Sequence, residues 1–162
     1  MLSTETPINK AAPPDAAIKT AANEQRASVS RPKILIAEDD PDQSEMLSDV
    51  LKDSGYEVDC ALRGDDAFRK LSERRYDLII LDIRMPGLNG GTVLKAFRLK
   101  NSLPRTPVIV VSAFASGADK ARYKKDGADM SFSKPYELNE LLQGISALLD
   151  PSAVSRPDTQ SG

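Results

Sequence analysis

Six side chains that end or follow apolar stretches of this sequence are of types that could do chemistry together. They are four carboxylates, one hydroxyl and one amine, and in chain order they are Glu38, Asp39, Asp40, Asp82, Ser112 and Lys134. Two carboxylates about 4 Å apart repel by roughly 4 kcal/mol at an effective dielectric of about 20, so such a cluster binds a proton or a cation. Because the ligands are oxygens and the chain has no histidine, the expected cation is Mg²⁺, with Mn²⁺ as a substitute.

A magnesium ion held by one or two carboxylates keeps coordination positions open for phosphate oxygens. A neighbouring carboxylate can then attack a phosphoryl group and form an acyl phosphate. The cation and the Lys134 ammonium would neutralise charge on the transferring group. This chemistry requires that three or four of the carboxylates, the hydroxyl and the amine meet at one place in the fold.

The composition excludes several other kinds of site. The 162 residues contain no histidine, which removes Ser-His-Asp and Cys-His triads, zinc fingers and phosphohistidine carriers. A single cysteine, Cys60, allows neither an internal disulfide nor a Cys-x-x-Cys pair. The formal net charge of −2 gives no global positive field to hold nucleic acid or an anionic membrane.

Apolar stretches alternate with helical patterns along residues 31–150. Strands are predicted at 33–37, 57–60, 77–81, 107–112 and 129–133. Helices are predicted near 41–54, 65–74, 90–100, 117–125 and 137–149. A series of five strand–helix units indicates a parallel sheet with helices on both faces.

The polarity of the strands predicts their order in the sheet. The stretches ILIA, LIIL and VIVV are continuously apolar, as strands covered on both faces are. Residues 57–60 alternate and residues 129–133 are mixed, so both are expected at edges. The order 2-1-3-4-5 fits, which is the doubly wound, flavodoxin-like α/β fold. Ligands of this fold bind beyond the carboxyl ends of the strands, where three or four of these carboxylates are expected to converge with Ser112 and Lys134.

The ends and faces of two helices can also be predicted. Asp40 is expected to cap the first helix, with Pro41 as its first residue. The helix at 117–125 has only Ala118, Ala121 and Tyr123 to bury. We therefore expect it to be the least firmly anchored helix.

The flanking segments differ in composition from this domain. Residues 1–30 contain no aromatic residue and are rich in Ala, Pro, Thr, Asn and Gln, so we expect a disordered tail. Residues 151–162 are expected to form a second tail. The sequence has neither an apolar stretch long enough to cross a bilayer nor a secretory h-region, so the expected location is the cytoplasm.

Four motifs in order resemble those of the receiver domain of a two-component response regulator. They are ILIAEDDP after the first strand, LDIRMPGLNG after the third, PVIVVSA at the fourth and SKPYE after the fifth. Each motif is weak alone, but all four occur at the strand ends where the family has them. The resemblance covers residues 31–150 and implies a protein that is phosphorylated on aspartate.

The resemblance also implies roles for individual residues. Asp82 would accept the phosphoryl group, and Lys134 would pair with Asp82 and with that group. Asp39 would bind Mg²⁺ directly, Glu38 would contact it through water, and the main-chain carbonyl of Arg84 would complete the protein ligands. Such a protein is a phosphoacceptor that catalyses only its own phosphorylation and dephosphorylation.

In the family, the hydroxyl after the fourth strand transmits the signal. Ser112 would bind a phosphoryl oxygen and draw the following loop inward, which would reposition the helix at 117–125 and the face that it forms with the fifth strand and last helix. The family further implies a cis bond between Lys134 and Pro135.

The chain departs from the family at two places. Ser131 stands where the family has an aromatic switch residue, and the neighbouring Phe132 is expected to point to the other face of the sheet. Arg84 and Phe114, two residues beyond Asp82 and Ser112, are large. Our hypothesis is that they hinder attacking water and lengthen the phosphorylated state.

We interpret the chain as a single-domain response regulator that receives its phosphoryl group from a sensor histidine kinase or a histidine phosphotransfer protein. Only twelve residues follow the domain, so the signal is expected to pass to a separate downstream protein, without nucleic acid or membrane. A further alternative is a homodimer that forms through the face of the fourth helix, the fifth strand and the last helix. A phosphate sink that competes for a shared kinase would fit the same residues.

Two further interpretations belong to other classes. A phosphohydrolase of the haloacid dehalogenase kind also uses a strand-end aspartate, but it needs a second Asp two residues later, where this chain has Arg84. A phosphorylation-independent scaffold would not need Asp39, Asp82, Ser112 and Lys134 together.

Overall fold

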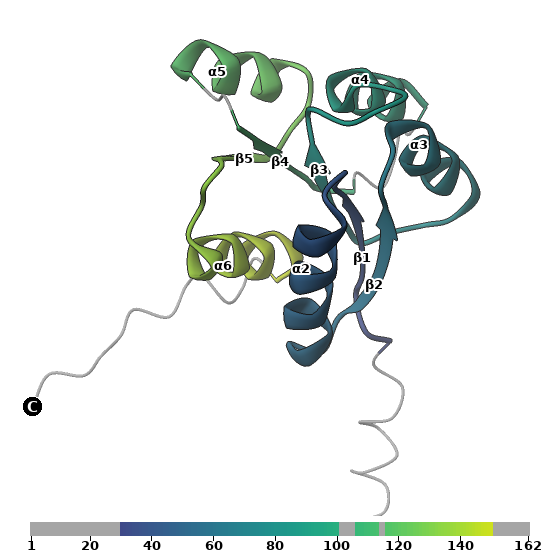
Figure 1. Ribbon diagram of the computed structural model, residues 1–162, viewed down its shortest axis with the longest axis vertical. Coiled ribbons are helices and arrows are strands. Elements are labelled where there is room, and N and C mark those ends of the chain that lie inside the picture. The colour runs from purple at the N-terminus through teal and green to yellow at the C-terminus, as the bar shows by residue number, and fades with distance from the viewer. Residues whose placement is uncertain (1–29, 101–105, 114–115, 151–162) are drawn as a thin grey trace, which may run out of the picture. The chain divides into compact units, whose positions relative to one another are not determined.

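A computed structural model describes residues 30–100, 106–113 and 116–150 of the chain. Within these residues a five-stranded parallel sheet has the order β2-β1-β3-β4-β5 (Figure 1). The strands are β1 (Lys33–Ala37), β2 (Glu57–Ala61), β3 (Leu78–Asp82), β4 (Val108–Ser112) and β5 (Met130–Ser133). The predicted order 2-1-3-4-5 and the doubly wound α/β fold are therefore confirmed.

Within the described part of the chain, five helices connect or follow the strands and cover both faces of the sheet. They are α2 (Pro41–Asp53), α3 (Gly64–Glu73), α4 (Gly90–Lys100), α5 (Gly117–Lys125) and α6 (Leu138–Leu149). Figure 1 shows α2 and α6 on one face and α3, α4 and α5 on the other. All predicted strands and helices are present, with ends within one residue of the predicted ones.

The alternation of side chains along the strands produces a separate core on each face. Leu35 and Ile79 pack among residues of α3 and α4, whereas their neighbours Ile34 and Ile80 pack among residues of α2 and α6. All four are essentially inaccessible to solvent, and burial of each side chain contributes roughly 1.5–3 kcal/mol. These central strands form a rigid platform whose carboxyl ends have fixed positions.

The N-terminal cap of α2 agrees with the sequence prediction, and α5 has a cap that the sequence analysis did not predict. Asp40 accepts from the backbone N–H groups of Asp42 and Gln43, and Pro41 is the first residue of α2, as predicted. Ser116 and Asp119 form a capping box at the start of α5.

The core-facing side of α5 is smaller than the sequence predicts. Tyr123 is buried, but Ala118 and Ala121 are exposed, so the expectation that these alanines are available to the core was wrong. Ala121 lines the pocket between α5 and the start of β5, so it faces open space rather than the packed core. The prediction of a weakly anchored helix is strengthened by this result.

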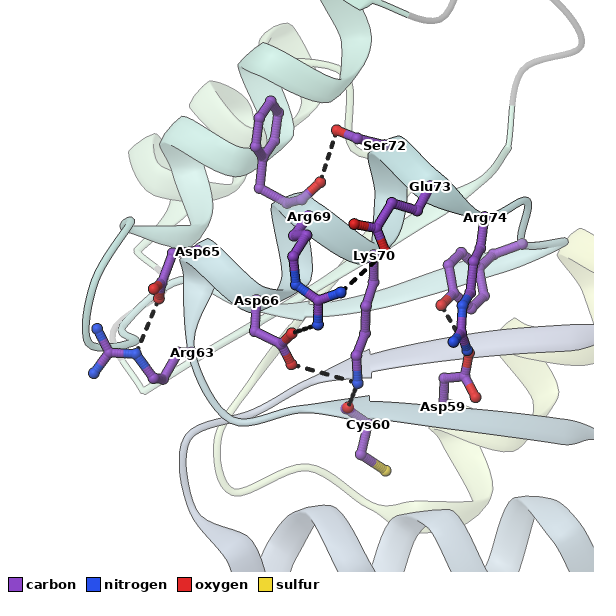
Figure 2. Close-up of polar contacts among 12 residues, drawn as sticks. Asp59, Cys60, Arg63, Asp65, Asp66, Arg69, Lys70, Ser72, Glu73 and Arg74 are labelled. Carbon is purple, nitrogen blue, oxygen red and sulfur yellow. Dashed lines mark hydrogen bonds and ion pairs between the residues drawn. The ribbon is translucent and has the colours of Figure 1, made fainter.

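Polar contacts from α3 cover the edge strand β2 (Figure 2). Lys70 donates to the main-chain carbonyl of Cys60 and lies 3.4 Å from an Asp66 carboxylate oxygen. Asp59 of β2 lies 3.1 Å from an Arg74 guanidinium nitrogen and accepts from the Tyr76 hydroxyl at 2.8 Å. Charges placed along an edge strand oppose pairing with another sheet, so this network protects β2.

Some predictions fall outside the described residues. They include the tails at 1–30 and 151–162, apart from Ser30, and the role of Phe114 beside the site. Among the described residues, no helix has the length and apolar character needed to cross a membrane.

Candidate functional site

The carboxyl edge of the sheet brings three charged side chains from three strands into contact. Asp82 ends β3, Glu38 follows β1, and Lys134 follows β5. The Lys134 ammonium lies 2.5 Å from Oδ2 of Asp82 and 2.6 Å from Oε2 of Glu38. Both carboxylates are 4% exposed, so the lysine bridges two buried anions.

The backbone around Lys134 fixes the direction of its side chain. Its main-chain N–H donates to the carbonyl of Ser112 at 2.8 Å, which continues the pairing of β5 with β4 beyond the strand end. The bond between Lys134 and Pro135 is cis, as the resemblance implied. The contact of Lys134 with Asp82 was expected, while its equally close contact with Glu38 was not.

The loop after β3 is shaped around Asp82. Its Oδ1 accepts from the backbone N–H of Arg84 at 2.8 Å, so the two oxygens of the carboxylate have different donors. The Gly90 N–H donates to the Ile83 carbonyl at 3.0 Å and returns the chain to the end of β3. A Cβ on Gly90 would lie 2.0 Å from the Asp82 carbonyl oxygen, so only glycine fits at this position.

Asp39 adds a third carboxylate to this edge. Oxygens of Glu38, Asp39 and Asp82 lie within 4.8 Å of one another, and Asp39 is exposed while the other two are buried. Every side-chain donor in the group is a carboxylate oxygen, which is the ligand type that Mg²⁺ prefers. One lysine does not neutralise three carboxylates, and the remaining negative charge faces the open side. The residues therefore fit a hard divalent cation.

Burial and the contacts within the bridge act in opposite directions on the pKa values of Glu38 and Lys134. Burial raises the pKa of Glu38 above its ordinary value, although the bond and charge of Lys134 act in the other direction. Burial alone would lower the pKa of Lys134, but its bonds to Asp82 and Glu38 outweigh it and raise that pKa. The lysine is consequently a permanent cation at neutral pH.

Ser112 lies at the same edge, at the end of β4 and beside the end of β3. It is 2% exposed and accepts from the hydroxyl of Tyr123 in α5 at 3.5 Å. Sequence reasoning missed this contact. The available signal was a lone tyrosine in a helix with little else to bury. The sequence alone does not show which group its hydroxyl contacts in the folded protein.

The two departures from the family have different outcomes. Phe132 packs in the α2–α6 core, where its ring lies 3.3 Å from the position that a Cβ on Gly144 would take. Ser131 instead lines a pocket beside α5, so the predicted opposite orientation of these neighbours is confirmed. Arg84 is exposed beside Asp82.

Comparison with known proteins identifies the family that the four sequence motifs resemble. A family model described as the response regulator receiver domain matches residues 34–146. Transcriptional regulatory protein PrrA of Mycobacterium leprae is 40% identical over 121 residues, which cover 75% of this chain and 51% of PrrA. Phosphate regulon transcriptional regulatory protein PhoB of Rhizobium meliloti is 36% identical over 118 residues, which cover 73% of this chain and 52% of PhoB. This chain thus spans about half the length of these relatives.

Solved structures of receiver domains have the same fold as this chain and match about three quarters of its length. The Francisella response regulator 1452 receiver domain matches with a TM-score of 0.71 and 31% identity, covering 75% of this chain and 98% of that one. Chemotaxis protein CheY4 of Vibrio cholerae matches with a TM-score of 0.69 and 32% identity, covering 74% of this chain and all of the other. The chain therefore belongs to the family of response regulator receiver domains of two-component systems.

Proposed function

We propose that Asp82 accepts a phosphoryl group from a histidine kinase or a histidine phosphotransfer protein and that this acts as a signalling switch. Receiver domains as a family accept phosphate from histidine kinases and bind Mg²⁺ at an acidic pocket. The observation that carries the proposal for this chain is the bridge of Lys134 to Asp82 and Glu38, with an Asp39 carboxylate oxygen within 4.8 Å of theirs.

The transfer exchanges one bond to phosphorus for another. An oxygen of the Asp82 carboxylate bonds to phosphorus as the bond from phosphorus to the donor's imidazole nitrogen breaks, and the imidazole keeps the electron pair. Lys134 is positioned to offset charge on the phosphoryl oxygens because its ammonium is 2.5 Å from Asp82. The N–H of Arg84 orients the carboxylate through Oδ1.

We assign the metal ligands from the same cluster. Asp39 and Asp82 would bind Mg²⁺ directly, the Arg84 main-chain carbonyl would be a third ligand, and Glu38 would contact it through water. When bound, the ion supplies positive charge that lets phosphoryl oxygens approach three carboxylates. Mn²⁺ would fit the same oxygen ligands.

The output face is the surface formed by α5, β5 and α6. Ser112 would turn its hydroxyl to a phosphoryl oxygen, and the change would reach this face through α5. The face would bind a downstream protein or a second copy of the chain. A cytoplasmic location stays a prediction.

A phosphate sink is the second candidate, and Ser131 is the observation that favours it. A sink needs to accept the phosphoryl group but does not need an aromatic switch residue, and β5 presents a serine beside α5. Binding of a downstream protein only to the phosphorylated form supports the switch. Loss of phosphoryl from a shared kinase without any such binding supports the sink.

Labelling with acetyl phosphate tests the proposal. We expect wild-type protein to acquire a hydroxylamine-sensitive acyl phosphate in Mg²⁺ and to lose this ability in EDTA. Asp82→Asn should abolish labelling, while Asp49→Asn on the exposed surface of α2 should not change it. Labelling of Asp82→Asn at the wild-type rate, or steady hydrolysis of a generic phosphatase substrate, would reject the proposal.

A further inference from the structure

Tyr123 connects the candidate site to α5 by one polar contact. Its hydroxyl donates to the Ser112 hydroxyl oxygen at 3.5 Å, and the two residues are 3% and 2% exposed. Tyr123 is also the buried residue of α5, so the contact joins the helix's main anchor to the end of β4. A change in the position of the Ser112 hydroxyl would therefore act directly on α5.

The surroundings of α5 leave it room to shift. A pocket of about 270 Å³ lies between α5 and the start of β5 and is lined by Lys120, Lys124 and Ser131 among others. A second pocket of about 250 Å³ lies between α5 and α4 and is lined by Tyr123 together with Thr92. Because both flanks of the helix are loosely filled, movement of α5 costs little packing energy.

Along the described strand β5, no aromatic side chain faces α5. Phe132 lies in the α2–α6 core, and Ser131 faces α5 with a side chain too short to fill the adjoining pocket. The Tyr123 ring instead projects from α5 towards the sheet. It packs in the same core cluster as Val110. Tyr123 thus places an aromatic ring and a hydroxyl next to Ser112 from a different element.

We propose that Tyr123 is a positioning residue that couples Ser112 to α5. This inference rests on the proposed phosphorylation of Asp82. In the unphosphorylated protein, the Tyr123 hydroxyl holds α5 by donating to Ser112. When the Ser112 hydroxyl turns to a phosphoryl oxygen, the phenol loses this acceptor and α5 shifts into the pockets beside it.

The length of the contact suits this role. At 3.5 Å the oxygens are farther apart than in a typical O–H···O bond, so the bond is weak and breaks at low cost. The ring remains buried on either side of the change, so the helix keeps its apolar anchor. The switch would alter a hydrogen bond while most of the burial is retained.

The experiment compares amide hydrogen exchange of residues 117–125 with and without Mg²⁺ and beryllofluoride, the phosphoryl mimic. In wild type, we expect beryllofluoride to raise the exchange rates of these amides by about twofold, as loss of one weak hydrogen bond would. Tyr123→Phe should exchange about twofold faster before beryllofluoride is added and show no further increase afterwards. Tyr76→Phe, which loses a buried-ring hydroxyl bond to Asp59 instead, should respond as wild type does.

Two additional measurements separate coupling from a merely structural effect. Tyr123→Phe should add nothing to the exchange rates of Ser112→Ala in the double variant, because both changes remove the bond between the two hydroxyls. In protein labelled with 3-fluorotyrosine, the ¹⁹F resonance of Tyr123 should shift on addition of beryllofluoride, and Ser112→Ala should abolish this shift.

The failures of the two proposals are distinguishable. If amides near Asp82 respond to beryllofluoride but α5 and the Tyr123 resonance do not, the coupling is rejected and the phosphorylation site stands. A full response of α5 in Tyr123→Phe would also reject the coupling. If no amide near Asp82 responds in wild type, the proposed function fails and this inference fails with it.

Discussion

At the scale of single residues, the site carries more negative than positive charge. Lys134 contacts Glu38 and Asp82, which are buried, and exposed Asp39 adds a third carboxylate oxygen within 4.8 Å of theirs. Like charges at this distance destabilise the folded protein by an amount that a bound cation removes. The carboxylate cluster that would bind the cation therefore lowers the stability of the folded protein while no cation is bound.

Asp39→Asn should separate these two effects. Without Mg²⁺, the variant should have a free energy of unfolding about 0.5 kcal/mol higher than wild type, because it removes one of three clustered charges. At Mg²⁺ about ten times the dissociation constant, wild type should gain about 1.4 kcal/mol and the variant almost nothing. Urea unfolding with Mg²⁺ or EDTA measures both quantities.

Asp49→Asn is the matched control for this prediction, since Asp49 is exposed on α2 and lies 3.8 Å from Lys52 outside the site. It should keep the wild-type response to Mg²⁺. An equal gain from Mg²⁺ in Asp39→Asn would show that Asp39 is not a ligand.

At the scale of elements, α4 begins in contact with the end of β3. The Gly90 backbone lies so close that a Cβ would be 2.0 Å from the Asp82 carbonyl oxygen, which cannot move because β3 is central in the sheet. The neighbouring Gly91 is different: a Cβ there would meet the Asn89 side chain at 3.1 Å. The start of α4 thus fixes the loop that orients Asp82.

Gly90→Ala should lower the free energy of unfolding by about 3 kcal/mol and reduce acetyl phosphate labelling, because the loop must shift away from Asp82. Gly91→Ala should change stability by less than about 1 kcal/mol, since a side chain can adjust. Unfolding and labelling of the two variants in parallel check this pair. Equal stability of Gly90→Ala and Gly91→Ala would contradict the close approach.

The edge strand β2 supplies a prediction that depends on pH. Asp59 lies near Arg74 (Figure 2) and accepts from the Tyr76 hydroxyl. The Lys33 ammonium lies 3.3 Å from the same carboxylate. Burial would raise the pKa of Asp59, but these three partners outweigh it and lower that pKa below its ordinary value of 3.8. A lowered folded-state pKa means that Asp59 stabilises the protein above about pH 4 and that this contribution is lost as pH falls further.

Asp59→Asn should therefore lower the free energy of unfolding by about 1 kcal/mol at pH 7, a modest value because the network is partly solvent-screened. The difference from wild type should shrink towards pH 3. Urea unfolding at both pH values measures it, with Asp49→Asn as the exposed-pair control. A difference that is constant from pH 7 to pH 3 would show that the charge of Asp59 is not responsible.

At the scale of the whole molecule, much of the architecture could be predicted because it depends on periodicity. Continuous apolar stretches identified β1, β3 and β4 as interior strands, and the period of two along β5 correctly separated Phe132 from Ser131. Strand order then placed Asp82 and Lys134 at one edge before any distance was known.

The contacts that could not be predicted depend on side-chain conformation. The approach of Lys134 to Glu38 as well as Asp82 requires its rotamer, and the Tyr123–Ser112 contact requires the rotation of α5. The error over Ala118 and Ala121 has the same origin, because helical spacing does not show how close a helix lies to the sheet.

The function proposed for the whole molecule depends on Asp82 as the residue that becomes phosphorylated. Its most direct test is to incubate the full chain with acetyl phosphate and Mg²⁺, reduce any acyl phosphate with borohydride, and locate the product by peptide mass spectrometry. We expect homoserine at position 82 in wild type, with Mg²⁺ and not in EDTA. Homoserine at another aspartate with residue 82 unmodified, or no reduced residue at all, would contradict it.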